Sequence, residues 1–280
     1  MTDELPSRNR STIALITGGT QGLGLAIAKR LALEGAPGIV ISGRNIEKGE
    51  AAAANVRSPQ TDCLFVRTDV SNAEDCHKLV ETAWAHFGSV NGLVNSAGIA
   101  DRGTLLDTSL ELWERHFNTN ARGPFLAMQH LVRHLVESGK PGSIVNIISM
   151  VAHCGQSYLT PYSASKGALA TLTKNVANAY AAKRIRCNGI LTGWMDTPGE
   201  NVTQRKFHGV GENWLAKAEA AQPMGQLVKP EQLAGLVAYM LSPESGVMTG
   251  ALVDYDQMSR EPIPSRGTPL YQGSHPDFYR

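Results

Sequence analysis

The sequence predicts one α/β domain in which a seven-stranded parallel sheet is flanked by helices. Two observations predict it: short apolar runs alternate with longer segments of helical periodicity, and most connections between them are short. Such alternation is typical of βαβ units, whose parallel strands are joined by crossover helices. A chain of 280 residues can bury the core of one such domain, and this length does not require a second one.

Seven apolar runs of five to seven residues are the expected strands. They are residues 12–17, 38–42, 63–67, 92–96, 143–149, 185–190 and 251–255. The helical pattern after the first run stops at Gly35, as expected for a glycine at a helix C-terminus. Further helices are expected over residues 45–56, 72–87, 109–137, 161–181 and 230–241.

Three segments lie outside this alternation. Residues 193–222 form a long polar connection that contains glycine and tryptophan, and we predict a lid or binding loop there. Residues 1–10 are a polar N-terminal segment ahead of the α/β domain, which we place at 11–255. The C-terminal extension, 256–280, is rich in proline and lacks periodicity, so we expect it to be disordered or to form an arm on another surface.

Charge and cysteine content argue against several kinds of partner. Lys and Arg total 26 and Asp and Glu total 25, so the net charge of +1 would attract neither nucleic acid nor an anionic membrane. The cysteines are scattered without a C-x-x-C pair, which argues against a metal site and favours free thiols in a reducing compartment. They are Cys63, Cys76, Cys154 and Cys187. With neither a signal sequence nor an apolar run near the roughly 18 residues of a spanning helix, we expect a soluble cytoplasmic protein.

A glycine-rich turn, TGGTQGLG, follows the first expected strand directly and opens the first helix. A dinucleotide pyrophosphate needs close backbone approach and N–H groups that point toward it, and Gly18, Gly22 and Gly24 can supply both. The spacing differs from the common G-x-G-x-x-G fingerprint, and tight turns use glycine as well. Its position after the first strand nevertheless favours a nucleotide site.

The end of the second strand indicates which cofactor is used. A carboxylate there binds the ribose 2′-OH of NAD(H), whereas an arginine suits the 2′-phosphate of NADP(H). This chain has Ser42, Gly43 and Arg44, with no carboxylate. NADP(H) is therefore favoured and NAD(H) is possible; the alternative is that Arg44 only opens the next helix in solvent.

Several ordered motifs resemble the short-chain dehydrogenase/reductase family in its common form of about 250 residues. They are TGGTQGLG, NSAG at 95–98, Asn120, Ser149 and YSASK at 162–166. The resemblance covers roughly residues 11–255. It implies one doubly wound Rossmann-type catalytic domain that transfers hydride between a nicotinamide cofactor and a carbonyl or alcohol. Extended members are longer, and the enoyl reductase branch separates its tyrosine and lysine by more residues, so neither matches this pattern.

The resemblance implies four catalytic residues: Tyr162 as general acid/base, Lys166, Ser149 and Asn120. Residues i and i+4 share a helix face, so the Lys166 ammonium could favour the ionised phenol of Tyr162. Ser149 would polarise the substrate carbonyl, and Asn120 would hold a water that links the lysine to solvent. Taken alone, the tyrosine and lysine could be a surface pair, Ser149 a strand-end serine and Asn120 a helix-bending amide.

The resemblance also implies cofactor contacts from the glycine turn, the strand ends and the segment after the sixth strand. They are Gly18, Thr20, Gln21, Gly22, Leu23, Gly24, Arg44, Asp69, Val70, Asn95, Ala97, Gly98, Tyr162, Lys166, Met195 and Thr197. The chain departs from the family at Thr192, where proline is commoner. It departs again at Tyr255 and Asp256, which replace two glycines.

The segments that should surround the substrate are polar with aromatic patches, and His153 is the most suggestive residue among them. The set is Asp101, Arg102, His153, Gln156, Tyr158, Trp194, Asp196, Glu200, Arg205, His208, Glu212, Asn213 and Trp214. Such side chains favour a small polyol, sugar or sugar acid. The alternatives are a more hydrophobic small ketone and a dinucleotide-binding sensor without catalysis. Family members also lead us to expect a homo-oligomer, a tetramer or a dimer.

Overall fold

A computed structural model describes residues 7–257 and shows one parallel sheet of seven strands in the order β3-β2-β1-β4-β5-β6-β7. The strands are β1 Ile13–Thr17, β2 Gly38–Gly43, β3 Asp62–Arg67, β4 Gly92–Asn95, β5 Gly142–Ile147, β6 Ile185–Thr192 and β7 Leu252–Tyr255. The expected fold class is confirmed, and no strand boundary moves by more than two residues. Most of the expected extension, and residues 1–6, lie outside the described residues.

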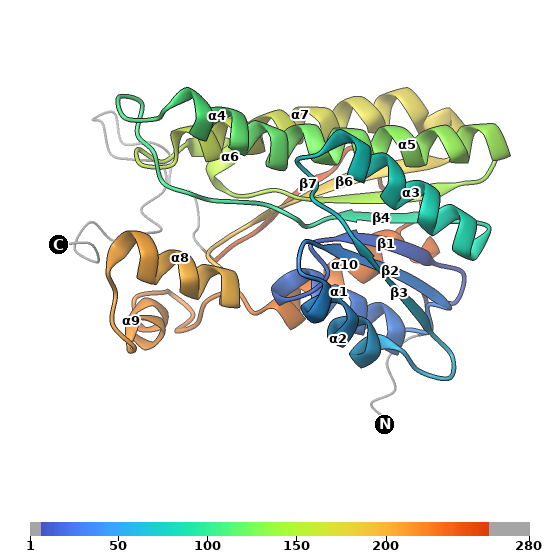
Figure 1. The fold of residues 1–280 in the computed structure, drawn as a ribbon, viewed down its shortest axis with the longest axis horizontal. Coiled ribbons are helices and arrows are strands. Elements are labelled where there is room, and N and C mark those ends of the chain that lie inside the picture. The colour runs from blue at the N-terminus through green and yellow to red at the C-terminus, as the bar shows by residue number, and fades with distance from the viewer. Residues whose placement is uncertain (1–6, 258–280) are drawn as a thin grey trace.

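Helices cover both faces of the sheet (Figure 1). They are α1 Gly22–Leu33, α2 Ile46–Val56, α3 Ala73–Phe87, α4 Leu110–Phe117, α5 Gly123–Ser138, α6 Val151–Cys154, α7 Thr160–Tyr180, α8 Pro198–His208, α9 Trp214–Ala220 and α10 Pro230–Leu241. Successive strand residues face opposite sides of a sheet. Ile16 accordingly packs in the core with α1, α2 and α10, while Leu15 packs in the core with α3, α5 and α7.

The expected helix over 109–137 is two helices joined by a π-helical turn, Asn118–Arg122. Pro124 follows this turn in the first residues of α5, and a proline has no N–H to continue the helical ladder. The side chain of Asn120 is fully buried within the turn. The helical periodicity on either side of the break concealed it.

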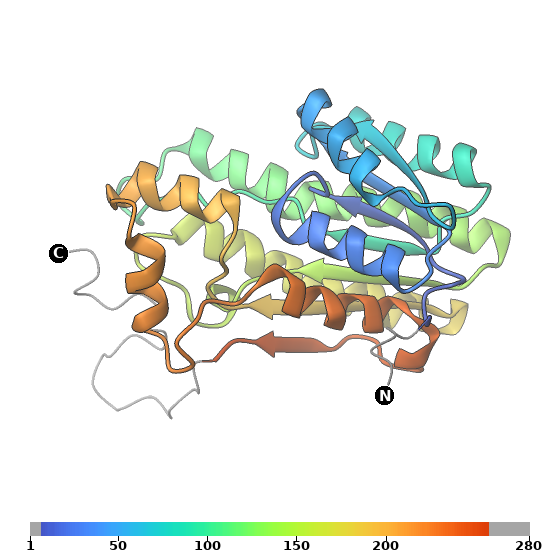
Figure 2. The same ribbon diagram turned by 90° about the horizontal axis from the view of Figure 1, so that it is seen from below.

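The segment 193–222, expected as a loop, contains α8 and α9. These helices lie beyond the ends of the strands, on the side toward which the strand arrows point (Figure 2). Their polar composition hid them, but α8 has a sequence signal: Thr197 accepts a hydrogen bond from the Glu200 N–H at 3.0 Å, and Pro198 occupies the first turn. The four-residue helix α6 was also missed. Within residues 7–257, every helix is too short or too polar to cross a membrane.

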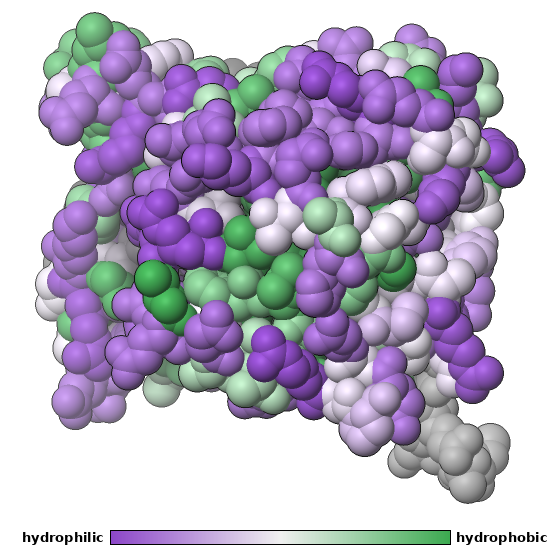
Figure 3. Space-filling model, turned by 45° about the vertical axis from the view of Figure 1, so that its right-hand side comes forward, coloured by the Kyte–Doolittle hydropathy of each residue, from purple (hydrophilic) through white to green (hydrophobic). Residues whose placement is uncertain are grey.

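Large apolar side chains also reach the surface. Leu105 and Leu106, which precede α4, are 81% and 97% exposed, and Trp113 and Phe125 on α4 and α5 are 37% and 40% exposed. On the face shown in Figure 3, hydrophobic residues gather toward the middle and hydrophilic residues surround them. Singly exposed apolar side chains are common on folded proteins and do not by themselves indicate a contact surface. The expected homo-oligomer stays a prediction.

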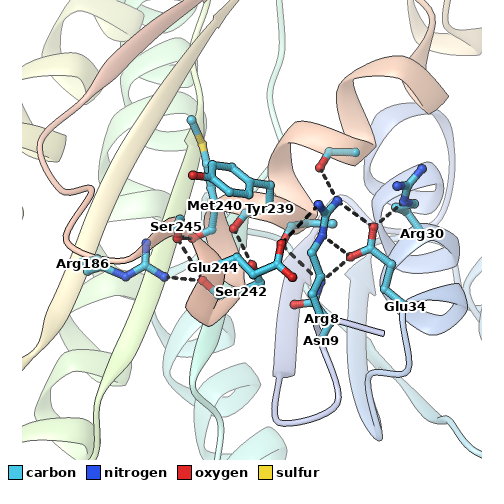
Figure 4. A network of polar contacts seen from close by, with 12 residues as sticks. Arg8, Asn9, Arg30, Glu34, Arg186, Tyr239, Met240, Ser242, Glu244 and Ser245 are labelled. Carbon is cyan, nitrogen blue, oxygen red and sulfur yellow. Dashed lines mark hydrogen bonds and ion pairs between the residues drawn. The ribbon is translucent and has the colours of Figure 1, made fainter. Parts of the chain in front are cut away.

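A buried polar network joins the segment before β1 to α1 and α10 (Figure 4). The Glu34 carboxylate, just after α1, is fully buried and accepts hydrogen bonds from Arg8 at 2.7 and 2.8 Å and from Asn9 at 2.7 Å. Arg30 also pairs with it. Arg8 and Asn9 in turn donate to the α10 carbonyls of Gly235 and Ala238, each at 3.2 Å. The network fixes the amino-terminal edge of the sheet to α1 and α10.

Replacing Glu34 by alanine should lower the free energy of unfolding by about 3–5 kcal/mol, because it leaves buried guanidinium groups without their partner. Glu244→Ala is the matched control. Its carboxylate is 54% exposed and lies 3.8 Å from the same Arg8, so its loss should cost less than about 1 kcal/mol. Urea unfolding followed by circular dichroism measures both. Equal losses in the two variants would contradict the structural role given to Glu34.

Candidate active site

A cavity of about 850 Å³ opens at the carboxyl ends of the strands. Its walls come from the glycine turn, from the ends of β2 to β6 and from α8. In open α/β sheets, ligands bind outside the carboxyl ends of the strands, where the strand order reverses. Here that reversal lies between β1 and β4. The cavity is therefore where a dinucleotide would be expected.

The glycine turn brings backbone segments closer than side chains would permit. A Cβ atom on Gly18, whose φ is +69°, would lie 2.9 Å from the backbone of Ala97. A Cβ atom on Gly24 would lie 2.3 Å from the carbonyl oxygen of Gly18. No side chain caps α1, because Gln21 at its N-cap makes no such hydrogen bond. The first N–H groups of α1 thus lack a side-chain acceptor where the turn meets the cavity, which suits a phosphate.

The ends of β2 and β3 place charged groups on the cavity wall. Arg44 is exposed there and lies near Asp69. Burial alone would raise the pKa of Asp69, but hydrogen bonds from Ser71 and the charges of Arg44 and Arg67 outweigh it and lower that pKa. The Ser71 hydroxyl and N–H donate to Asp69 at 2.7 and 3.0 Å. Asp69 is held as an ionised acceptor at this wall.

All but two of the expected catalytic and cofactor-binding residues line the cavity. The exceptions are Asn95 and Asn120. Asn95 points into the core, where its Nδ2 donates to the Asn146 Oδ1 at 2.8 Å. The side chain of Asn120 binds the segment after β4. Its Oδ1 accepts a hydrogen bond from the Ile99 N–H at 3.0 Å. Its Nδ2 donates to the Ile99 carbonyl at 2.9 Å and to the Ser165 hydroxyl at 3.0 Å. Both amide side chains therefore lie behind the residues that line the cavity and hold the strand ends and the segment after β4 in place.

Tyr162, Ser149 and Lys166 come together on the wall of the cavity. Tyr162 lies in the first turn of α7 and Ser149 just beyond β5, and the Ser149 hydroxyl is close enough to the phenol to lower its pKa. Lys166 is 5% exposed, and its Nζ donates to the Ile147 carbonyl at 2.8 Å. The same Nζ lies 5.8 Å from the centre of the Tyr162 ring. The four-residue spacing thus places both side chains on one helix face, as the sequence indicates.

Burial dominates the electrostatics of this cluster. It raises the pKa of Tyr162, while the hydrogen bond from Ser149 and the charge of Arg102 lower it and Glu200 raises it further. Burial also lowers the pKa of Lys166 from 10.5 to about 8. The sequence-based expectation was a lowered tyrosine pKa. The structure differs because desolvation outweighs the attractive charges around the phenol.

The polar set expected around the substrate divides in two. The cavity is lined by Asp101, Arg102, Gln156, Tyr158, Trp194 and Glu200. Outside the lining are His153, Asp196, Arg205, His208, Glu212, Asn213 and Trp214. His153 was the most suggestive candidate for substrate contact, and this expectation is wrong. It lies on α6 and pairs with Asp254 of β7 at 3.0 Å instead of lining the cavity. The turn of α6 was not visible in the sequence.

Sequence reasoning missed two features of the site. His116 on α4 is fully buried, its ring centre lies 6.4 Å from that of Tyr162, and burial lowers its pKa. Gln204 on α8 is 1% exposed and donates to the Glu200 carboxylate at 2.7 Å. The sequence carries no signal for His116, whereas the capping pattern of α8 could have placed Gln204 one turn after Glu200. Among residues 7–257, no cluster of histidine, cysteine and carboxylate side chains could hold a metal ion.

Comparisons with known proteins agree with this geometry. A family model described as "Enoyl-(Acyl carrier protein) reductase" matches residues 18–257. The cis-4-hydroxycyclohexanecarboxylate dehydrogenase of Sinomonas cyclohexanicum is 34% identical over 245 residues, which cover 87% of this chain and 94% of that protein. The NADP-dependent (R)-specific alcohol dehydrogenase of Lentilactobacillus kefiri is 34% identical, with coverage of 90% and 96%. The (3R)-3-hydroxyacyl-CoA dehydrogenase of Mus musculus is 35% identical, with coverage of 88% and 95%.

Solved structures share the fold. A mutant of actinorhodin polyketide ketoreductase with NADPH matches with a TM-score of 0.81 at 28% identity, covering 89% of this chain and 97% of that one. A mutant short-chain dehydrogenase/reductase of Serratia marcescens matches with a TM-score of 0.79 at 30% identity, covering 89% and 98%. With the family model matching most of the chain and several relatives above 30% identity, this chain belongs to the short-chain dehydrogenase/reductase family.

Proposed function

We propose that this protein interconverts a secondary alcohol and a ketone with NADP(H), and that Tyr162 is its general acid/base. As a family member it is an NAD(P)-dependent dehydrogenase or reductase acting on CH–OH groups. The observation that carries the proposal is that Tyr162, Ser149 and Lys166 line the same cavity as the glycine turn, with Ser149 close enough to Tyr162 to lower the pKa of its phenol. The catalytic domain in this proposal is 11–255.

The cavity wall fits a dinucleotide. Gly18 and Gly24 allow the backbone to approach closely, and the uncapped start of α1 suits the pyrophosphate. Met195 and Thr197 also line the cavity and would meet the nicotinamide. Thr197 lies beside the glycine turn, since a Cβ atom on Gly22 would be 3.5 Å from it. When bound, the nicotinamide supplies or accepts the hydride.

The proton is the part of the reaction that this chain handles. In reduction, Tyr162 donates its proton to the carbonyl oxygen as hydride reaches the carbon, and Ser149 donates a hydrogen bond to the same oxygen. In oxidation, the phenolate accepts the alcohol proton. A Tyr162 pKa raised by burial keeps the phenol protonated at neutral pH, which suits the acid role. A Cβ atom on Gly98 would lie 3.3 Å from Asn120 Oδ1 and 3.6 Å from Lys166 Nζ, so both polar atoms border one small space, which supports the proposed water there.

NADP(H) is the proposed cofactor because Arg44 follows β2 and no carboxylate occupies that strand end. The Lentilactobacillus kefiri relative is NADP-dependent by name, and the polyketide ketoreductase structure contains NADPH. NAD(H) is the alternative.

The polar lining supports a small hydroxylated substrate such as a polyol, sugar or sugar acid. The name of the Sinomonas cyclohexanicum relative also specifies a hydroxylated acid. A more hydrophobic small ketone is the alternative. A sensor that only binds dinucleotide has no need of the Tyr162 phenol. A cytoplasmic homo-oligomer completes the proposal.

Tyr162→Phe should lower kcat by at least about a hundredfold, because it removes the proton donor and keeps the ring. NADPH binding, followed by cofactor fluorescence, should change little, which shows that the variant is folded. Turnover equal to that of the wild type would refute the assigned role.

Arg44→Gln should lower kcat/KM for NADPH by about tenfold or more, because a charge-assisted hydrogen bond to the 2′-phosphate is lost. The value for NADH, which lacks that phosphate, should stay near that of the wild type. Parallel losses with both cofactors would show that Arg44 does not select between them.

Lys166→Met should raise the free energy of unfolding by about 1–3 kcal/mol at pH 7 without cofactor, because it removes a buried charge. The folded-state pKa of Lys166 is about 8, against 10.5 in the unfolded chain. Between these values the unfolded chain binds the extra proton, so wild-type stability rises with pH and the advantage of the variant shrinks. Urea unfolding at pH 7 and at pH 10 measures this change. A stability difference that is the same at both pH values would contradict the burial of this ammonium.

A further inference from the structure

Two charged side chains in the cavity act on Tyr162. Arg102, in the segment after β4, lowers the pKa of the phenol, and Glu200, in the first turn of α8, raises it. Both groups line the cavity, so both face the space where a substrate would meet Tyr162. They come from two different parts of the wall.

Arg102 is held in a fixed orientation. Its Nη1 donates to the Ala100 carbonyl at 2.8 Å, and its Nε donates to the His208 Nε2 at 3.1 Å. The guanidinium carbon lies 5.5 Å from the ring centre of Tyr158 and 5.9 Å from that of Phe207. Burial and the charge of Arg102 lower the pKa of His208 to about 4, so the imidazole is neutral and accepts the hydrogen bond at neutral pH. A rigid fork of donors is thereby presented at the cavity wall.

The carboxylates nearby have other partners. Asp101 pairs with Arg115 and with Lys206, each at 3.1 Å. Glu200 Oε1 accepts hydrogen bonds from Trp194 at 2.8 Å and from Gln204 at 2.7 Å. Within residues 7–257, no carboxylate forms an ion pair with Arg102. A half-buried guanidinium without a counter-ion is an unfavourable arrangement unless a ligand supplies the anion.

We propose that Arg102 binds a carboxylate of the substrate, so that the enzyme acts on oxo acids and hydroxy acids whose carboxylate lies away from the reacting carbon. The guanidinium can donate two parallel hydrogen bonds to a carboxylate. Glu200 would repel a doubly charged phosphate, so a singly charged group fits better. This inference rests on the proposed reaction at Tyr162 and narrows the class of hydroxylated substrates to acids.

A purely structural role for Arg102 makes a different prediction. Arg102 and Lys206 both tie α8 to the segment after β4, through His208 and through Asp101. If Arg102 only held α8 in place, its loss would impair charged and neutral substrates alike. Lys206 lies outside the cavity lining and makes the matched control, because Lys206→Gln removes a cation from the same junction without changing the cavity wall.

The test measures kcat/KM for three oxo acids, 4-oxopentanoate, 5-oxohexanoate and 4-oxocyclohexanecarboxylate, each beside its primary amide. At least one acid should exceed its amide by about tenfold or more, the size expected for a charge-assisted contact. Arg102→Gln should abolish this preference by lowering only the value for the acid, and Lys206→Gln should keep it. NADPH fluorescence confirms that each variant still binds cofactor.

The outcomes separate this inference from the proposed function. Amides used as well as acids, or an equal loss for both in Arg102→Gln, would overturn the carboxylate site and leave the reaction at Tyr162 intact. Turnover of neutral ketones only would likewise overturn the carboxylate site and leave the proposed reaction at Tyr162 intact. If no carbonyl compound, charged or neutral, consumes NADPH or NADH, the proposed function fails and this inference fails with it.

Discussion

The close contact between the start of α1 and the end of β1 is the constraint on which the cavity depends. Because Gly24 approaches the Gly18 carbonyl so closely, α1 can begin directly at the strand end with its first N–H groups beside the cavity. Gly18 in turn lets the end of β1 contact Ala97, and Thr17 accepts hydrogen bonds from the N–H groups of Ser96 and Ala97. These contacts fix the position of the segment after β4, which forms part of the cavity wall and contains Arg102.

The two edges of the sheet are built differently. At the amino edge, the buried Glu34 carboxylate is satisfied by three partners and stabilises the contact of α1 with α10. At the carboxyl edge, Ser42 Oγ and Asn95 Oδ1 are buried without hydrogen-bond partners among the described residues, and Lys166 is an ammonium held in a buried position. Buried groups left in this way are unfavourable for folding. Ser42 and Lys166 line the cavity and Asn95 lies behind its wall, as expected for a binding site, while the Glu34 network stabilises the fold at the opposite ends of the strands.

Much of the fold could be predicted from the sequence, because apolar runs, helical periodicity and the glycine turn are local patterns. Tyr162, Lys166 and Ser149 could also be identified, because the resemblance to the family points to them and their places on a helix face and at a strand end agree with it. The direction of a side chain in the segment after a strand could not be predicted. The position of His153, for example, is set by the short helix α6, which places it beside Asp254. Whether Arg102 has a carboxylate partner also could not be predicted. It depends on tertiary contacts, since Asp101 pairs with Arg115 and Arg102 donates to His208, and no local sequence pattern indicates these pairings.

The central claim is that one cavity positions a nicotinamide cofactor against Tyr162. A crystal structure of the protein with NADP(H) tests it most directly. The account predicts the pyrophosphate at the glycine turn, the 2′-phosphate beside Arg44 and the nicotinamide ring beside Tyr162 and Ser149. A dinucleotide bound elsewhere, or one whose nicotinamide ring points away from Tyr162, would contradict it.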